Sequence, residues 1–372
     1  MTKARNIAEL ANDISVDNNR DVTLSNLRSD QPMTFRNRII NGNFEIWQRG
    51  NTSRTFGNAG VYSADRWCRS GYQSAAHERV TVSSPVAGMT SRYAIRSSSC
   101  TTAEDANGSR MTVDQKIESV NCYDLAGKQI TFSFWIRFSS TASSLGSSFS
   151  SRVQYNTSNT DSTTLSDLGD GNICGNTISS TSLPTAWTKI TKTGLVPAGV
   201  QNLTPRFQFN NLVSTASAGS EWFEITEVQV EEGTVPTPFE HRPIGTELAL
   251  CQRYAIMFGN NTVNNTGDGG NFSLGFIDTI DNFAGMIFLP TTMRERPVLN
   301  AWGTSNFEIA YTDLTISTVS GVDISQIQHI STKNLVFFTI SSGQTNQHRQ
   351  QPASFRYATN SNTDAFLLES EL

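Results

Sequence analysis

The sequence has 372 residues, a formal net charge of −5 at pH 7, 37% hydrophobic residues and 16% charged residues. This length allows two or three domains with their own cores. The acidic balance argues against nucleic acid as a main partner, and no run approaches the roughly 20 apolar residues of a membrane-spanning helix. The low charged share predicts a surface of Ser, Thr, Asn and Gln, which is typical of β-rich proteins.

The first 36 residues predict a short helix followed by a linker. In KARNIAELANDI, the apolar positions Ile7, Leu10, Ala11 and Ile14 are spaced i, i+3, i+4 and i+7, which places them on one helix face. Such a helix of about three turns is marginal alone in water. We therefore expect it to pack either against its own domain or against a docking partner or sister chain. The start of the chain lacks the apolar region of a signal peptide.

From Ile39 the pattern changes to that of strands. In QITFSFWIRFSS (129–140), apolar residues alternate with polar ones, so five side chains share one face and Trp135 lies on the other. Further strands are predicted in RYAIRSS, SRMTVDQKI, WTKITKTGLV, PRFQFNN and EWFEITEVQV. Short strands separated by Gly, Pro, Asn and Ser predict an antiparallel sandwich. The Ser-rich stretch 139–151 and the polar stretch 155–182 are predicted to be long loops.

The run PTPFEHRPIGTEL (236–248) predicts a domain boundary, because its three prolines cannot continue a strand ladder. Thr246 can cap a helix over TELALCQRYAIMF. The remaining residues predict further strands, in GMIFLPTTM, FEIAYTDLTIS, KNLVFFTIS and DAFLLESEL. The expected organisation is an N-terminal segment (1–36), a β sandwich (37–243) and a second β domain (244–372) that opens with a short helix.

The residues that support catalysis are mostly absent. The four histidines have no metal-binding spacing, and no GxSxG, Walker A or GxGxxG motif occurs. A pair of carboxylates can be assembled in space by any fold. The acidic candidates Asp161, Asp167 and Asp170 lie in the Ser-rich loop without an apolar frame. Five cysteines without a CxxC motif indicate reduced thiols. We expect no enzyme activity, no cofactor and no metal.

Trp135 is the best single candidate for a ligand-binding side chain. Aromatic faces stack on sugar rings, and Trp135 lies on the polar face of its predicted strand. The alternatives are a contact between subunits and simple core packing, which is the commoner role of Trp.

Several runs in order resemble a family of tailed-bacteriophage and prophage virion proteins, usually described as tail fibre or receptor-binding proteins. These are NRIINGNFEIWQRG, YSADRWC, FSFWIRFSS and EVQVEEGTVPTPFEHRPIGTELALCQRY, followed more weakly by FLPTTMRERPVL and the terminal ESEL. The first part is also similar to jelly-roll carbohydrate-binding modules that open with an NGxFE strand. In those modules the first and last strands lie close together, often around a structural calcium. The matching positions here are Glu45 and Glu227, but Thr226 stands where those modules favour a second acidic residue.

The resemblance implies a jelly-roll sandwich in a non-enzymatic virion protein that is assembled in the bacterial host cytoplasm. It also implies homotrimers, contacts with other virion proteins through the N-terminal segment, and attachment to a host surface glycan. A capsid decoration protein or head fibre, and less readily a polysaccharide depolymerase, are the alternatives. The runs NGNFEIW (41–47) and EVQVEEG (227–233) are expected to open and close the sandwich.

Overall fold

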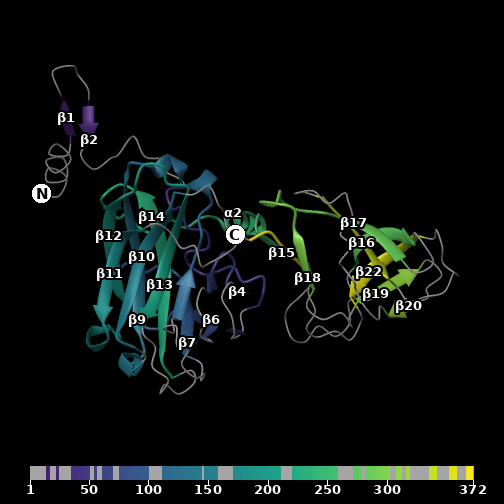
Figure 1. Ribbon diagram of the computed structural model, residues 1–372, viewed down its shortest axis with the longest axis horizontal. Coiled ribbons are helices and arrows are strands. Elements are labelled where there is room, and N and C mark those ends of the chain that lie inside the picture. The colour runs from purple at the N-terminus through teal and green to yellow at the C-terminus, as the bar shows by residue number, and fades with distance from the viewer. Residues whose placement is uncertain are drawn as a thin grey trace, which may run out of the picture.

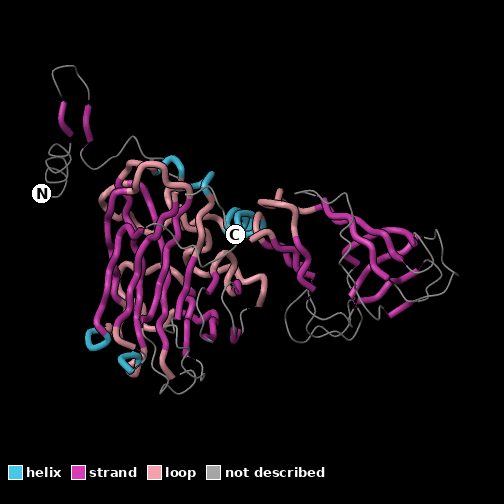
Figure 2. Tube along the Cα trace, viewed as in Figure 1, coloured by secondary structure: helices cyan, strands magenta, loops and turns pink. Residues whose placement is uncertain are grey.

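The computed structural model describes most of the chain between residues 35 and 258, together with separate strands before and after it. The described ranges are 14–16, 22–24, 35–50, 54–56, 61–69, 75–99, 111–144, 146–157, 171–210, 220–258, 271–277, 282–301, 307–311, 316–318, 335–341, 352–357 and 366–371. Strands dominate this structure, and helices form short pieces (Figure 2). No helix in these ranges is long and apolar enough to cross a membrane.

Two six-stranded antiparallel sheets pack face to face and form the larger part of the molecule (Figure 1). The first sheet has the order β11-β10-β13-β8-β5-β4. Its strands are β4 (Val61–Tyr62), β5 (Cys68–Arg69), β8 (Met111–Asp114), β10 (Ser148–Asn156), β11 (Gly171–Ser179) and β13 (Asn202–Asn210).

The second sheet of the sandwich has the order β12-β9-β14-β7-β6-β3. Its strands are β3 (Arg54–Phe56), β6 (Ala75–Thr81), β7 (Tyr93–Ser99), β9 (Gln129–Phe138), β12 (Thr188–Leu195) and β14 (Trp222–Glu232). Four short 3₁₀ helices accompany the strands: η1 (Ser119–Asn121), η2 (Tyr123–Leu125), η3 (Ala142–Ser144) and η4 (Ser180–Ser182). From β8 onward the chain crosses repeatedly between the sheets, which makes a jelly-roll sandwich. The predicted fold class is thereby confirmed.

The core of the sandwich is a cluster of phenylalanines from both sheets. The apolar row of β9 points inward as its alternation predicts, and Phe134 meets Phe207 edge-on with ring centroids 4.8 Å apart. Phe149 lies 5.0 Å from Phe138 and 5.1 Å from Phe223 in similar edge-on pairs. Each such pair is worth roughly 0.5–1.5 kcal/mol beyond its burial. These aromatic contacts fix the spacing between the two sheets.

Two further sheets follow the sandwich in the described part of the chain. One has the order β15-β23-β18, with β15 (Ala255–Phe258), β18 (Val298–Ala301) and β23 (Phe366–Glu369). The other has the order β20-β19-β22-β16-β17-β21, with β16 (Asn271–Ile277), β17 (Asn282–Phe288), β19 (Phe307–Tyr311), β20 (Ile316–Thr318), β21 (Leu335–Ser341) and β22 (Pro352–Tyr357).

The helix predicted over residues 246–258 is shorter and starts earlier. Helix α2 spans Ile244–Gln252, with Pro243 rather than Thr246 at its N-cap. The following AIMF residues form β15, because they pair with β23 at the far end of the sequence. A local pattern cannot reveal such a distant strand partner.

The N-terminal prediction is only partly within the described residues. Ile7, Leu10 and Ala11 lie outside them, so the docking helix stays a prediction. Ile14, however, begins strand β1 (Ile14–Val16), which pairs with β2 (Val22–Leu24) inside the segment predicted as linker. The sequences ISV and VTL are rich in β-branched residues, which favour strands over helices.

The two stretches predicted as long loops hold a pair of strands. Strands β10 and β11 pair with each other, and β10 also pairs with β13. Ser and Asn occupy so many positions in both strands that the apolar alternation is weak in the sequence. Residues 158–170, with Asp161, Asp167 and Asp170, lie outside the described residues.

Candidate functional site

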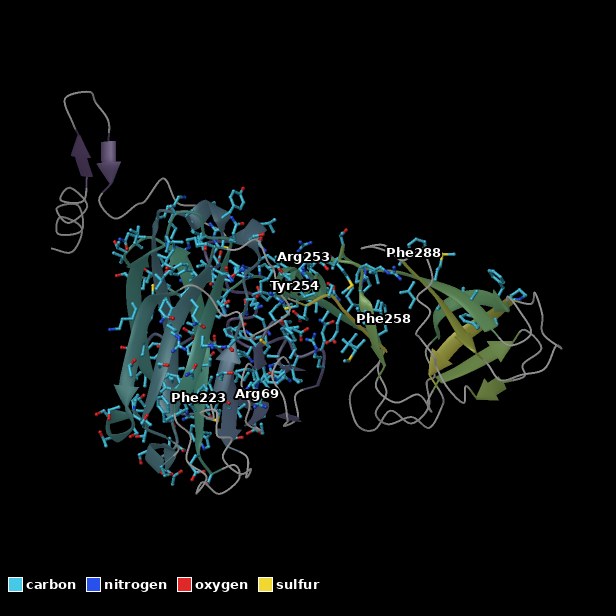
Figure 3. The ribbon with its side chains drawn as sticks, viewed as in Figure 1. Arg69, Phe223, Arg253, Tyr254, Phe258 and Phe288 are labelled. Carbon is cyan, nitrogen blue, oxygen red and sulfur yellow. The ribbon has the colours of Figure 1, made fainter. Side chains whose placement is uncertain are left out.

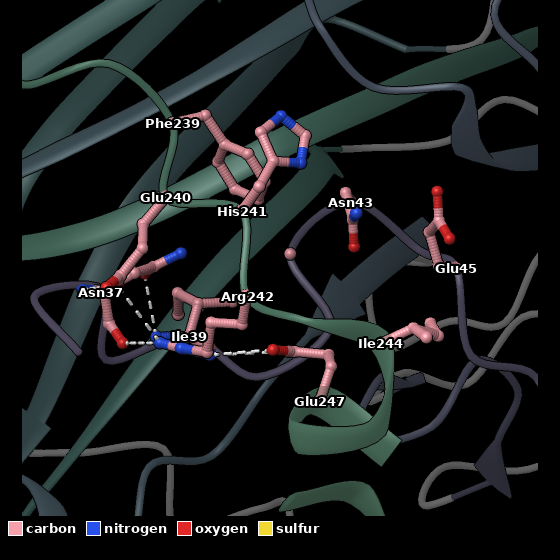
Figure 4. A pocket seen from close by; sticks show the side chains of 11 residues that line it. Asn37, Ile39, Asn43, Glu45, Phe239, Glu240, His241, Arg242, Ile244 and Glu247 are labelled. Atoms are coloured by element: carbon pink, nitrogen blue, oxygen red, sulfur yellow. Dashed lines mark hydrogen bonds and ion pairs between the residues drawn. The ribbon is translucent and has the colours of Figure 1, made fainter. Parts of the chain in front are cut away.

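A small pocket lies between residues 37–45, at the start of the sandwich, and residues 239–247, which follow its last strand (Figure 4). Its volume is about 140 Å³. The lining residues are Asn37, Ile39, Gly42, Asn43, Glu45, Phe239, Glu240, His241, Arg242, Ile244 and Glu247. One wall therefore comes from the beginning of the sandwich, and the other comes from the segment that leaves it.

The first wall is a loop held by side-chain hydrogen bonds, not the NGxFE strand that the resemblance implied. Residues 38 and 42 still lie beside β14, since Arg38 N–H donates to Val230 O over 2.8 Å and Val228 N–H donates to Gly42 O over 3.0 Å. Beyond them, Asn41 adopts a positive φ of 56°. Its side-chain amide provides hydrogen bonds that a neighbouring strand would otherwise provide. The amide accepts from the Ile46 N–H (2.9 Å) and donates to the Ile46 carbonyl (2.8 Å). Asn tolerates this left-handed conformation better than most residues.

Gly42 is required at this turn because the backbone of β14 passes very close. A Cβ at position 42 would lie 2.3 Å from the carbonyl oxygen of Val228. Phe44, with φ of 57°, then turns its ring into the core, where its centroid lies 5.0 Å from that of Trp67. Asn43 lies between the buried residues Gly42 and Phe44, and Glu45 follows Phe44. The side chains of Asn43 and Glu45 are partly exposed.

The second wall is tied to the first by Arg242. Its guanidinium donates to the carbonyls of Asn37 and Ile39, the latter over 3.0 Å, and pairs with Glu247 over 3.1 Å. The Glu247 carboxylate in turn accepts from the N–H of Asn41. Glu240 accepts from the N–H of Asn37 over 2.8 Å. These contacts occupy both carboxylates and fix residues 239–247 against the opening loop (Figure 4).

Four other polar or aromatic side chains line the pocket without a hydrogen bond or ion pair to Arg242: the amide of Asn43, the carboxylate of Glu45 and the rings of Phe239 and His241. Neither Asn43 nor Glu45 has a side-chain hydrogen bond to another described residue. Opposite them, the rings of Phe239 and His241 meet edge-on with centroids 4.9 Å apart. His241 Nε2 lies 2.7 Å from the hydroxyl oxygen of Thr90, which donates its own proton to Glu227 over 3.1 Å. The Thr90 hydroxyl therefore links the His241 ring to the Glu227 carboxylate.

Glu227 occupies a bulge in β14, and backbone N–H groups engage its carboxylate. The pairing of β14 with β9 shifts between Thr226 and Gln229, and Glu227 has a positive φ of 51°. Its carboxylate accepts the N–H groups of Thr90 and Ser91 over 2.5 Å and 2.8 Å. Among the described residues, no group of three or more His, Cys, Asp or Glu is arranged to hold a metal ion.

Trp135 lies on the outer face of β9, as its place in the alternation predicts. Its side chain is only 8% exposed, because it packs with Ala94 and Trp187 in a small cluster covered by Met89 and other apolar residues. The ring is therefore largely covered by side chains of its own chain. The indole N–H has no hydrogen-bond partner within the described part of the chain. Ligand binding by Trp135 stays a prediction.

The cysteines behave as expected where they are described. Cys68, Cys122, Cys174 and Cys251 are free and buried. Burial raises the pKa of Cys174 to about 12, so this thiol stays protonated and unreactive at neutral pH. Cys100 lies outside the described residues.

The pocket was not predicted from the sequence. Its residues lie in the two runs that stand out by their density of Asn, aromatic and charged residues, and this density was the available signal. Which side chains face each other depends on the contacts of Arg242 with the opening loop, and no local pattern encodes them.

Comparisons with known proteins give no family. No family model matches the sequence, and no curated protein does. Similar solved structures include the CBM22-1–GH10 modules of a Clostridium thermocellum endo-1,4-beta-D-xylanase complexed with xylohexaose (14% identity, TM-score 0.27, 50% of this chain and 29% of that chain). A xylan-binding domain from carbohydrate-binding module family 22 has 13% identity and a TM-score of 0.30, over 50% of this chain and 100% of that chain.

A third similar structure is the enzymatically active domain of tailspike protein 4 from bacteriophage CBA120. It has 12% identity and a TM-score of 0.29, over 53% of this chain and 21% of that chain. The chain thus spans less than a third of the xylanase and tailspike chains. At these TM-scores the neighbours do not define the function of this chain.

Proposed function

We propose that this protein is a non-enzymatic structural protein of a bacteriophage virion, of the tail fibre or receptor-binding type. Its N-terminal segment docks on other virion proteins, its β domains are presented to a glycan of the host surface, and its chains associate as homotrimers. The sequence runs that resemble phage virion proteins motivate the particle role. The pocket between residues 37–45 and 239–247 is the observation that carries the glycan role.

The chemistry of the pocket suits one sugar ring. The free carboxylate of Glu45 and the amide of Asn43 can accept and donate hydrogen bonds to hydroxyl groups, while Phe239 offers an aromatic ring for stacking. A cavity of about 150 Å³ takes a six-membered ring such as benzene. The pocket, at about 140 Å³, is of that size. A terminal pyranose of a surface polysaccharide is therefore the proposed ligand.

The arrangement of carboxylates supports binding rather than hydrolysis. Glycoside hydrolysis needs two available carboxyl groups on either side of the scissile bond. Glu240 and Glu247 are already engaged by Arg242 and by backbone N–H groups. That leaves Glu45 as the one free carboxylate among the residues that line the pocket.

A binding measurement tests the glycan role. Purified full-length protein is titrated with polysaccharide from the host surface by isothermal calorimetry. We expect Glu45→Gln and Asn43→Ala to weaken binding at least tenfold, because the first removes the charge of a hydrogen-bond acceptor and the second removes the amide from the pocket. Glu295→Gln, an exposed carboxylate of the C-terminal part, is the matched control and should bind like the wild type. Equal affinity for all variants would exclude this pocket, and release of reducing ends would favour a depolymerase instead.

Electron cryo-microscopy of intact particles tests the virion role. Copies of the chain at the tail or baseplate are expected, whereas copies at capsid vertices or threefold positions would identify a decoration protein or head fibre. Deletion of residues 1–36 should abolish incorporation and leave soluble oligomers. Normal incorporation of the truncated chain would contradict docking through the N-terminal segment.

A further inference from the structure

One face of the C-terminal six-stranded sheet exposes large apolar side chains. On β16, Leu274 and Phe276 are 72% and 51% exposed; on β17, Met286 and Phe288 are 44% and 74% exposed. The register places Leu274 directly opposite Met286, so the four side chains, two residues apart on each strand, form one continuous patch. These four residues are called the apolar face below. Figure 3 labels Phe288 at the end of β17.

The other face of the same two strands is already a core. Ser273 on β16 and both Phe283 and Ile287 on β17 are buried, as is Ala353 of the adjacent β22. Antiparallel sheets that face water on one side normally carry polar residues there. A sheet that is apolar on both sides requires a layer over each of them. The exposed fractions show that no described part of the chain forms such a layer over the apolar face.

Charged residues are absent from the two strands of the apolar face and from β21, whereas β22, on the other side of β16, carries Arg356 opposite Asn271. The sequences of β16 (NFSLGFI), β17 (NFAGMIF) and β21 (LVFFTIS) contain no Asp, Glu, Lys or Arg. The register continues the apolar pattern, with Leu335 and Phe337 of β21 at the positions opposite Phe288 and Met286. β21 is also an edge strand of its sheet. Edge strands of monomeric proteins usually carry charges or proline that prevent association.

We propose that the apolar face is the contact surface between copies of this chain. An identical face is apolar, uncharged and of the same size, so two or more copies around a symmetry axis cover one another without burying an unpaired charge. A large apolar side chain buries roughly 150–250 Å², so the four exposed fractions leave on the order of 400 Å² of apolar surface in water. A standard interface takes about 800 Å² from each partner. The apolar face therefore supplies the centre of such an interface.

This proposal assigns a surface to the self-association that is part of the proposed function. Sedimentation equilibrium of the full-length protein tests it. The wild type should have a mass that is a multiple of the 40.8 kDa chain, and Phe288→Lys or Leu274→Glu should raise the dissociation constant at least 100-fold. Val120→Lys alters a similarly exposed apolar residue (61%) on η1 of the sandwich and should leave the mass unchanged.

A cross-linking variant distinguishes loss of the contact between chains from misfolding of the charged variants. Phe288→Cys should form covalent oligomers with a short bismaleimide, while the four described native cysteines are buried. A wild-type mass of 40.8 kDa at all concentrations would overturn the proposal, and so would oligomers that persist in both charged variants. A monomer that floats with neutral phosphatidylcholine vesicles would instead identify a lipid partner. None of these readouts involves a glycan, so a failure here is distinguishable from a failure of the binding pocket.

Discussion

The guanidinium carbon of Arg66 lies 3.4 Å from the centroid of the Tyr254 ring, and both side chains are buried. Arg66 belongs to the sandwich, whereas Tyr254 follows helix α2, where the chain has left it (Figure 3). Arg66 also donates to the carbonyl of Lys116 over 2.6 Å and pairs with Glu371 near the end of the sequence. Arg49 pairs with Glu369 over 2.8 Å and with Glu371 over 3.0 Å. Two buried arginines thus tie the last residues to the sandwich.

Loss of Arg66 should destabilise the protein strongly. Arg66→Met keeps much of the volume but removes one cation from beside the Glu371 carboxylate and leaves the Lys116 carbonyl without its donor. We expect the free energy of unfolding in urea to fall by about 3–5 kcal/mol, the usual cost of breaking a buried ion pair. Lys128→Met breaks the exposed pair with Glu232 and should cost about 0–1 kcal/mol. Similar losses in both variants would mean that the buried pair gives no special stability.

Two glycine substitutions should have opposite effects. Gly42→Ala places a Cβ 2.3 Å from the Val228 carbonyl oxygen, so the opening loop must move away from β14. We expect a loss of at least about 2 kcal/mol of unfolding free energy and weaker glycan binding, since the loop forms one wall of the pocket. Gly245→Ala, near the start of α2 with open space around it, should raise stability by up to about 1 kcal/mol. Thermal unfolding of both variants measures the difference.

The sequence predicted the parts of this fold that depend on local alternation. The apolar row of QITFSFWIRF required β9 to bury one face, and the structure has the row inside. Asn41 and Gly42 could not be placed by alternation, because their conformations depend on contacts with Val228 and Glu247, which other parts of the chain supply. The pocket follows from the same distant contacts. Local sequence therefore predicted the sandwich but not its site.

The same distinction explains Trp135. The alternation placed its ring on the outer face correctly, but Trp187 and Met89, which cover it, come from other segments. We expect Trp135→Ala to lower the free energy of unfolding by about 3–5 kcal/mol, the usual cost of removing a buried Trp, and Trp135→Phe to lower it by less. Urea unfolding of the two variants measures this. A loss below about 1 kcal/mol for Trp135→Ala would show that the ring does not act as packing.

The stability of the protein should fall in acid because of His77. Burial, with a smaller contribution from the charge of Arg69, lowers the pKa of His77 to about 3. The unfolded chain takes up a proton near the ordinary pKa of about 6.5, whereas the folded protein does not. The contribution of neutral His77 is therefore fully present above pH 6.5 and is lost as the pH falls toward 3.

His77→Gln removes this proton uptake and gives a direct test. Between pH 6 and pH 4, the unfolding free energy of the wild type should fall relative to the variant by about 1.4 kcal/mol per pH unit. The difference between the two proteins is needed because Asp65 acts in the opposite direction: burial raises its pKa to about 6, so its contribution is present in acid and is lost as the pH rises through 6. Asp65 is common to both proteins and cancels. A difference that stays flat over this pH range would mean that His77 is protonated in the folded state.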